Sequence, residues 1–240
     1  MDVSDALLLC ELHAHSTWSD GYLTLPDLVD LYGEAGFDVL GVTDHARPLA
    51  DPSPLSVDAW TWPGYLEAVR AEAERAAAEY GLLVIPGLEL TEDRDDPDLS
   101  AHVLALGLER HVSLEHGILA AIADAEHQGA ALIGAHPYAS DDLTPHRPTL
   151  RIWRERELFR ERLHRFELFN RHEVFGWVAA ERLPAIASGD NHRAEHLSSW
   201  KTLIPCPKEE AAIVDYLRSE ERVYLTPLAL DGCERLSAAA

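Results

Sequence analysis

Cysteine and lysine are scarce in this chain of 240 residues, which contains three cysteines and two lysines. The cysteines, at positions 10, 206 and 233, are odd in number and widely separated, which argues against a disulfide framework or a zinc ribbon and indicates reduced thiols. The chain has only 20 basic residues but 42 acidic ones, which gives a formal net charge of −22. This charge argues against binding of long DNA or RNA, because phosphate neutralisation requires clustered lysine and arginine.

Long apolar runs are also missing. None approaches the roughly 18–20 residues of a membrane span, and the acidic first five residues have the wrong charge for a secretory signal. We therefore expect a cytoplasmic protein without a membrane partner. No Gly/Ser linker, repeat or shift in composition divides the chain, so we expect one domain over residues 1–240, with its core at about 6–226 and a C-terminal tail at 227–240.

Apolar runs alternate with helical patterns along the chain. Strands are expected at residues 6–13, 37–43, 82–90, 102–108, 130–135, 165–169, 185–188, 201–204 and 222–225. Helices are expected at residues 25–35, 62–80, 113–128, 152–164, 173–181 and 208–219. This alternation predicts βα units and a parallel α/β sheet, and about seven units in one domain favour a closed barrel.

Histidine is frequent, with 13 residues, and histidines fall together with acidic residues near strand ends. The segments are His13-Ala14-His15, Ser19-Asp20-Gly21, Thr43-Asp44-His45, Gly87-Leu88-Glu89, His102, His136-Pro137 and Asp190-Asn191-His192. Two imidazoles that lie two residues apart on a strand point the same way and can converge on one cation. All segments except His102 lie where a strand passes into a loop, which is the edge where barrel enzymes build their sites. The set therefore predicts a metal site.

In this order the segments resemble the PHP (polymerase and histidinol phosphatase) family, whose members are mostly phosphoesterases. The resemblance covers residues 11–192 and implies a distorted seven-stranded (β/α)7 TIM-like barrel with up to three divalent ions. It implies one ion on His13, His15, Glu89 and Asp190, a second on Asp20, His45 and His192, and a third on His102 and His136, with Glu89 as a bridge. Imidazole and carboxylate ligands suit manganese, zinc and iron. Gly189 departs from the family, which commonly has serine there, and we expect only a local hydrogen bond to change.

Other residues near the predicted ligands are candidates for substrate contact: Arg47, Asn170, Arg171, Arg193 and His196. A guanidinium group binds phosphate well because it can donate two parallel hydrogen bonds. The six arginines between residues 151 and 165 instead fit a solvated helix, on which Glu161 pairs with Arg165. Asp44 is expected to orient a ligand imidazole. The histidines at 111, 116, 127, 146 and 164 fall in helices or loops and are not expected to be ligands.

The predicted function is metal-dependent hydrolysis of a small phosphate ester, either a phosphomonoester or a nucleotide, by attack of a hydroxide that bridges two metals. Asp190 and His192 are then catalytic residues as well as ligands. Hydrolysis of a carbamate, ester or amide makes the same demands on the metals and stays open, as does a non-catalytic metal-binding domain. Amidohydrolases with a carboxylated lysine on a middle strand are disfavoured, because Lys201 and Lys208 lie too late in the chain. The sequence has neither a P-loop nor a Gly-x-Ser-x-Gly element.

Overall fold

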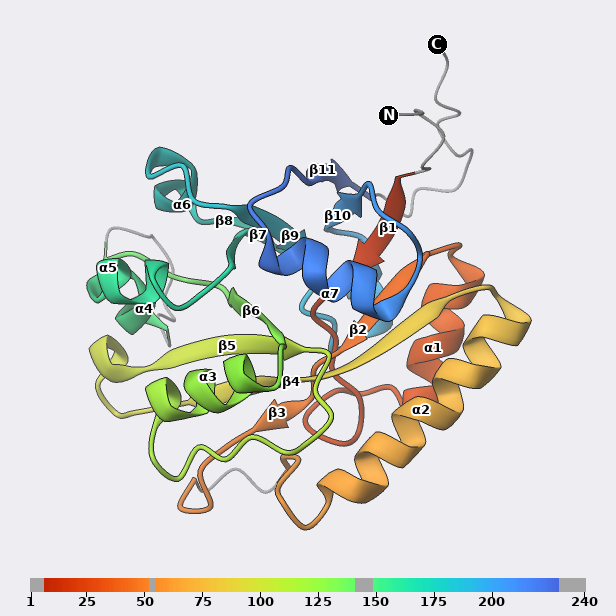
Figure 1. Cartoon of the computed structure of the whole chain (residues 1–240), viewed down its shortest axis with the longest axis horizontal. Helices are drawn as coiled ribbons and strands as arrows, with labels where there is room; N and C mark the ends of the chain where they lie inside the picture. The colour runs from red at the N-terminus through yellow and green to blue at the C-terminus, as the bar shows by residue number, and fades with distance from the viewer. Residues whose placement is uncertain (1–6, 52–54, 141–148, 229–240) are drawn as a thin grey trace.

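The computed structural model describes residues 7–51, 55–140 and 149–228, and these build one curled mixed sheet covered by helices (Figure 1). The strands in chain order are β1 (Leu8–Glu11), β2 (Val39–Val42), β3 (His45–Ala46), β4 (Leu83–Glu92), β5 (Ala101–Leu106), β6 (Ala131–Gly134), β7 (Arg165–Asn170), β8 (Glu173–Val174), β9 (Ala185–Ser188), β10 (Trp200–Ile204) and β11 (Tyr224–Pro227). The main path through the sheet is β11-β10-β1-β2-β4-β5-β6-β7-β8, while β3 pairs with β4 and β9 pairs with β7.

The helices lie on the outside of the curled sheet and at one end of it. They are α1 (Leu25–Glu34), α2 (Trp62–Glu79), α3 (Ile118–His127), α4 (Leu150–Arg154), α5 (Arg156–Arg160), α6 (Gly176–Ala180) and α7 (Glu210–Arg218), with short 3₁₀ turns η1 (Pro97–Leu99) and η2 (Ala194–Leu197). α1 begins as its sequence predicts, because the Thr24 hydroxyl accepts a hydrogen bond from the Asp27 amide and Pro26 fills the first turn. Its buried residues Leu25, Leu28, Val29 and Tyr32 recur at helical spacing and face the core.

The expected α/β class is confirmed, but the uniform parallel order is not. β1, β2 and β4 are parallel, as are β6, β7 and β9, whereas β5 runs antiparallel to both of its neighbours. Only η1 joins β4 to β5, so no helix is available to return the chain to the other end of the sheet. β10 and β11 are antiparallel as well. The curled sheet is consistent with a TIM-like barrel, while the count of seven βα units is not confirmed.

The two ends of the curled sheet meet around β1, β9 and β10. The Thr202 hydroxyl on β10 accepts a hydrogen bond from the Ala187 amide and donates one to the Ala187 carbonyl on β9. Beyond the strands, Ala14 and Asn191 form an isolated parallel bridge, in which the His15 amide donates to the Asn191 carbonyl and the Asn191 amide to the His13 carbonyl. Segments that are far apart in the sequence therefore become neighbours where β1 and β9 end.

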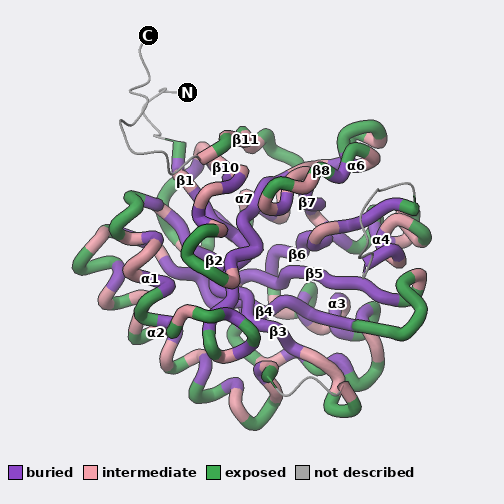
Figure 2. The backbone as a smooth tube through the Cα atoms, turned by 180° about the vertical axis from the view of Figure 1, so that it is seen from behind, coloured by how far each residue is buried: buried purple, intermediate pink, exposed green. Residues whose placement is uncertain are grey.

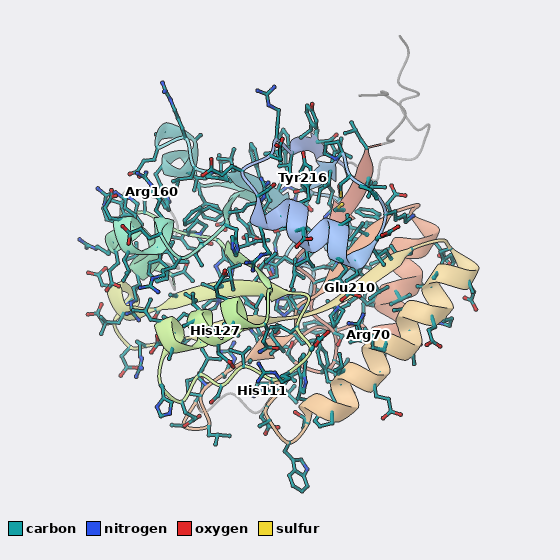
Figure 3. The ribbon with its side chains drawn as sticks, viewed as in Figure 1. Arg70, His111, His127, Arg160, Glu210 and Tyr216 are labelled. Carbon is teal, nitrogen blue, oxygen red and sulfur yellow. The ribbon has the colours of Figure 1, made fainter. Side chains whose placement is uncertain are left out.

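Burial follows this layout, because the strands are mostly buried whereas α1 and α2 alternate between buried and exposed residues (Figure 2). A larger apolar cluster lies between sheet and helices, and a smaller one joins strand residues such as Ile85 and Ile186 to Ile213 and Leu217 of α7. α7 packs beside Gly107 and Ala130, which places it where β5 ends and β6 begins. Arg70 of α2 and Glu210 of α7 point toward each other and form an ion pair (Figure 3).

Several expected elements differ in detail. The expected helix at 113–128 begins only at Ile118, and the one at 152–164 is two short helices, α4 and α5. Arg165 does not pair with Glu161 on a helix, since it opens β7 and its buried guanidinium donates to the carbonyls of Leu217, Tyr216, Ser219 and Glu221. Cys10 and Cys206 are buried, while Cys233 and most of the expected tail lie outside the described residues. Among the described helices, none has the length and apolar content needed to cross a membrane.

Candidate metal centre

The nine predicted ligands converge at one end of the sheet. His13 and His15 follow β1, His45 lies in β3, Glu89 in β4, His136 follows β6, and Asp190 and His192 follow β9. His102 joins them from the start of β5, because the antiparallel register sets it opposite Thr91 near the carboxyl end of β4. The reversed strand thus explains how a ligand near the start of a strand joins the others. Asp20 comes from the turn after His15, and it is the most exposed of the nine.

The side chains of these residues form four overlapping groups whose ligand atoms lie within 4.8 Å of one another. The groups are His15, Asp20, His45 and His192; His13, His136 and Asp190; His13, His15 and Glu89; and Glu89, His102 and His136. They correspond closely to the three predicted ligand sets, with two additions: His15 also approaches the second set, and His136 also approaches His13 and Asp190.

Glu89 lies between the groups and presents one oxygen to each side. Its Oε1 is 3.0 Å from His102 Nδ1 and 3.1 Å from His136 Nε2. Its Oε2 is 3.5 Å from His13 Nε2 and 3.4 Å from His15 Nε2. Oε2 also lies 2.9 Å from His45 Nδ1, so a single buried carboxylate faces atoms of all three predicted metal sets.

Mutual charge interactions shift the pKa values in the group. Burial opposes ionisation of Glu89 and Asp190, yet the imidazoles around them hold the pKa of both carboxyl groups well below the usual range. Burial also lowers the pKa of His102 and His192, but the adjacent carboxylates outweigh it and raise the pKa to about 9 and about 10. For His15, burial and the neighbouring His45 lower the pKa to about 3. The carboxylates thus stay negative, and His15 keeps an unprotonated nitrogen at neutral pH.

The residues fit a divalent metal ion. His13 Nε2 and His15 Nε2 are buried without a hydrogen-bond partner among the described residues. Each of these nitrogens lies 3.4–3.5 Å from Glu89 Oε2 and from Asp190 Oδ1. Buried polar atoms almost always have a partner, and a cation among these four atoms would supply one to both nitrogens. Imidazole with carboxylate, without thiolate, is typical of catalytic metal sites with open positions.

No family model and no curated protein sequence matches this chain. Its fold does match solved structures. A two-domain protein from Bacteroides vulgatus that contains a predicted PHP-like metal-dependent phosphoesterase superposes with a TM-score of 0.68 at 21% sequence identity, over 93% of this chain. The chain has a PHP-like fold.

Two further proteins share this fold. PsfC from Pseudomonas syringae matches with a TM-score of 0.59 at 15% identity, over 93% of this chain and 92% of that one. An amidohydrolase from Chromobacterium violaceum matches with a TM-score of 0.52 at 15% identity, over 76% and 87% of the two chains. The chain spans only 65% of the length of the two-domain Bacteroides protein.

Behind the ligands of this PHP-like fold lie polar residues that sequence reasoning missed. Glu167 of β7 accepts a hydrogen bond from His13 Nδ1 at 2.8 Å. Thr91 Oγ1 lies 2.7 Å from His45 Nδ1, and Asp93 Oδ1 lies 2.9 Å from His102 Nε2. Glu167 is a single polar position in an apolar stretch, whereas Thr91 and Asp93 lie at the start of an acidic one. None of the three has a motif of its own, so only the fold reveals their contacts.

Asp44 has a different role from the expected one. Its carboxylate accepts hydrogen bonds from the Ser16 amide and hydroxyl and from the Ser19 hydroxyl at 2.6 Å, and it contacts no imidazole directly. Ser19 Oγ lies 3.5 Å from His15 Nδ1. Asp44 therefore holds the turn that carries Asp20 and reaches His15 only through Ser19.

The structure gives a reason for glycine at position 189. Glu11 and Lys201 form a fully buried ion pair directly beneath the Asp190 turn. A Cβ atom at Gly189 would lie 2.5 Å from both Glu11 Oε2 and Lys201 Nζ. The Glu11 carboxylate also accepts hydrogen bonds from the backbone amides of Gly189 and His13. The glycine therefore leaves room for a buried ion pair, which is more than the local hydrogen bond expected.

A pocket of about 290 Å³ opens beside the ligands and contains three of the five expected substrate contacts: Arg47, Asn170 and Arg171. Tyr138 and Glu173, which sequence reasoning did not select, line it as well. Arg193 and His196 are not among the lining residues. Arg193 stacks on the Tyr22 ring at 3.9 Å, and His196 Nδ1 accepts a hydrogen bond from the His192 amide.

The backbone is strained around the same pocket. His136, Arg171 and Asp190 have φ values of 28°, 52° and 43°, and Arg182 is the other described non-glycine residue in this region of φ. Such conformations cost about 1–3 kcal/mol each and persist only where the surroundings hold them. Arg171 is held by Asp190, since its guanidinium donates to the Asp190 carbonyl and lies 3.0 Å from Oδ2.

The remaining described histidines lie outside these groups. His111 and His127 lie on the face drawn in Figure 3, His111 beside Trp62 and His127 at the end of α3. His164 Nδ1 accepts a hydrogen bond from the Leu132 amide. His146 falls outside the described residues.

Proposed function

We propose that this protein is a metal-dependent hydrolase of small phosphate esters, either phosphomonoesters or nucleotides. The observation that carries the proposal is the pair of unpartnered nitrogens on His13 and His15, which face Glu89 and Asp190 at the edge of a pocket. The PHP-like fold supports it, since one solved protein with that fold is described as containing a predicted metal-dependent phosphoesterase.

We assign the metal ligands as the resemblance implies. His13, His15, Glu89 and Asp190 would hold one divalent ion. Asp20, His45 and His192 would hold a second, and His102 and His136 would hold a third together with Glu89. Manganese, zinc or iron bound there would supply Lewis acidity and lower the pKa of water. The two oxygens of Glu89 face opposite groups, which supports its bridging role.

The pocket residues complete the assignment. Arg47 and Arg171 are the two arginines that line the pocket, and their guanidinium groups could neutralise phosphoryl oxygens. Asp190 and His192 reach the pocket from the turn after β9, which is why we place them at the reacting centre. A cavity of about 290 Å³ suits a small substrate, and the net charge of −22 disfavours a long polyanion.

The test is elemental analysis of the purified protein together with a hydrolase screen. We expect two to three transition-metal ions per chain and turnover of phosphomonoesters or nucleotides when manganese, zinc or iron is added. An aryl ester and an aryl carbamate are assayed in parallel. Turnover of the ester or the carbamate, and not of the phosphate esters, would favour the alternative of a carbonyl hydrolase. The fold shared with an amidohydrolase supports that alternative. A metal-replete protein that is inert toward the whole panel would indicate a non-catalytic metal-binding domain.

A further inference from the structure

Glu167 is a fully buried carboxylate behind the candidate metal centre, and four groups donate hydrogen bonds to it. Its Oε1 accepts from His13 Nδ1 at 2.8 Å and from the Ser188 hydroxyl. Its Oε2 accepts from the His136 backbone amide at 2.6 Å and from Asn170 Nδ2 at 2.8 Å. One side chain therefore joins a predicted ligand of the first metal to a predicted ligand of the third.

The contact with His13 decides which nitrogen of that imidazole carries the proton. A carboxylate only accepts hydrogen bonds, so His13 donates from Nδ1. Neutral His13 then keeps a free lone pair on Nε2, the buried and unpartnered nitrogen that faces Glu89 and Asp190. A carboxylate on the far nitrogen also makes an imidazole a better metal ligand.

The contact with His136 acts on the backbone. His136 has a φ of 28°, a conformation that needs support from its surroundings. Glu167 supplies part of that support by accepting the amide hydrogen of this residue. The conformation directs His136 Nε2 to within 3.1 Å of Glu89 Oε1.

The strand itself is shaped around this carboxylate. The pairing of β7 with β9 shifts register between Glu167 and Phe169, an irregularity of the β-bulge kind. A regular strand would put Glu167 and Phe169 on one face, whereas the irregularity lets Asn170 reach Glu167. Bulges of this kind re-aim side chains beside functional sites. Asn170, expected to contact substrate, thereby has its amide engaged in the wall of the pocket.

We propose that Glu167 is a positioning residue, which fixes His13 with its free lone pair on Nε2 and holds His136 in place, so that two metal sets form together. The proposal rests on the proposed metal-dependent function. It predicts that Glu167 controls metal affinity although it does not touch a metal.

The substitution Glu167→Gln tests this directly because it keeps the shape and replaces one oxygen by a donor. Two donors face the Oε2 position, one of them a fixed backbone amide, so the amide oxygen of the new side chain is expected there. Its NH₂ group then faces His13 Nδ1, while the Ser188 hydroxyl can turn to accept. Neutral His13 would have to accept at Nδ1 and carry its proton on Nε2, where the metal lone pair is needed.

The experiment titrates metal-free protein with cobalt(II) and follows both the stoichiometry and the visible absorption of the bound ion. Relative to the wild type, we expect Glu167→Gln to weaken cobalt affinity by about 10–100-fold and to alter the spectrum. Glu92→Gln is the matched control: Glu92 is also buried and accepts hydrogen bonds from the Ile118 amide and from Arg151, but bonds no histidine. This control should bind cobalt as the wild type does.

A change in affinity or spectrum that Glu92→Gln shares would overturn the proposal, as would wild-type cobalt binding by folded Glu167→Gln. If Glu167→Gln does not fold, Glu167→Asp replaces it. That variant keeps the charge but is one methylene too short to hold both His13 and the His136 amide, and unchanged cobalt binding by it would count equally against the proposal. Failure of the proposed function looks different, because the wild type itself would then take up no cobalt or would bind it without hydrolysing any substrate.

Discussion

Gly189 offers a sharp test of how the turn that carries Asp190 is supported. The substitution Gly189→Ala adds a Cβ atom that would lie 2.5 Å from Glu11 Oε2, 2.5 Å from Lys201 Nζ and 3.0 Å from the His196 carbonyl oxygen. The tips of long side chains normally move at little cost. Here both tips are fully buried and bonded to each other, and the third contact is backbone. The turn and the ion pair must therefore shift together.

The expected cost combines overpacking with a loosened buried ion pair. Overpacking alone costs about 1–3 kcal/mol, and complete loss of one partner of a buried pair costs about 3–5 kcal/mol. Because the pair is displaced and not broken, we expect a decrease of about 2–3 kcal/mol in the free energy of unfolding. For a chain of this length each kcal/mol corresponds to about 2–4 °C, so Tm should fall by about 4–12 °C in differential scanning calorimetry.

Gly176→Ala is the matched control, because a Cβ atom there meets no other atom within 4 Å. We expect its Tm to stay the same or to rise slightly, since alanine is favoured over glycine in a helix. The double variant Gly189→Ala/Lys201→Met should lose less stability than the sum of its parts, because the methionine removes one of the colliding atoms. Equal Tm values for the two glycine variants, or full additivity in the double variant, would refute the reasoning.

Three further predictions concern the site and the core. Glu89→Gln should lower the metal content by at least one ion per chain, because both oxygens of Glu89 face predicted ligand groups. The circular dichroism spectrum should stay unchanged. A metal content equal to that of the wild type would contradict the bridging role of Glu89. Removal of metal by a chelator should lower the free energy of unfolding by about 2.7 kcal/mol relative to protein at a free metal concentration of 100 times Kd. The Tm values of the metal-free and metal-bound protein measure this difference. Equal Tm values would argue against metal binding by the folded state. Arg165→Met should lower the free energy of unfolding by about 3–5 kcal/mol, because four carbonyls around the end of α7 lose their donor. Its metal content per folded chain should equal that of the wild type. Loss of metal without loss of stability would contradict a purely structural role of Arg165.

The elements with strong local signals could be predicted from the sequence. α1 and α2 begin at the expected residues, and β9 has the expected bounds, because caps and apolar periodicity are local properties. The reversal of β5 could not be predicted in this way, since its direction depends on η1 being too short to return the chain. The two-residue strands β3 and β8 arise only from pairing with β4 and β7.

In the candidate site, too, residues with a local sequence signal could be predicted and residues that depend on long-range contacts could not. The structure brings all nine predicted ligands together, and all of them except Asp20 lie in a strand or just after one. The residues behind them could not be found in the sequence. Neither Glu167 nor Thr91 belongs to a motif, and their partners lie 154 and 46 positions away. The need for a residue without a side chain at position 189 likewise depends on an ion pair between residues 11 and 201.

The bridge between Ala14 and Asn191 has a consequence for biosynthesis. During translation the amino-terminal strands leave the ribosome first, and they present His13, His15 and His45 long before Asp190 and His192 exist. An ion captured at that stage would meet only part of its coordination sphere. We therefore expect metal to bind after the chain has left the ribosome, and this binding to fix the end of β1 against the end of β9.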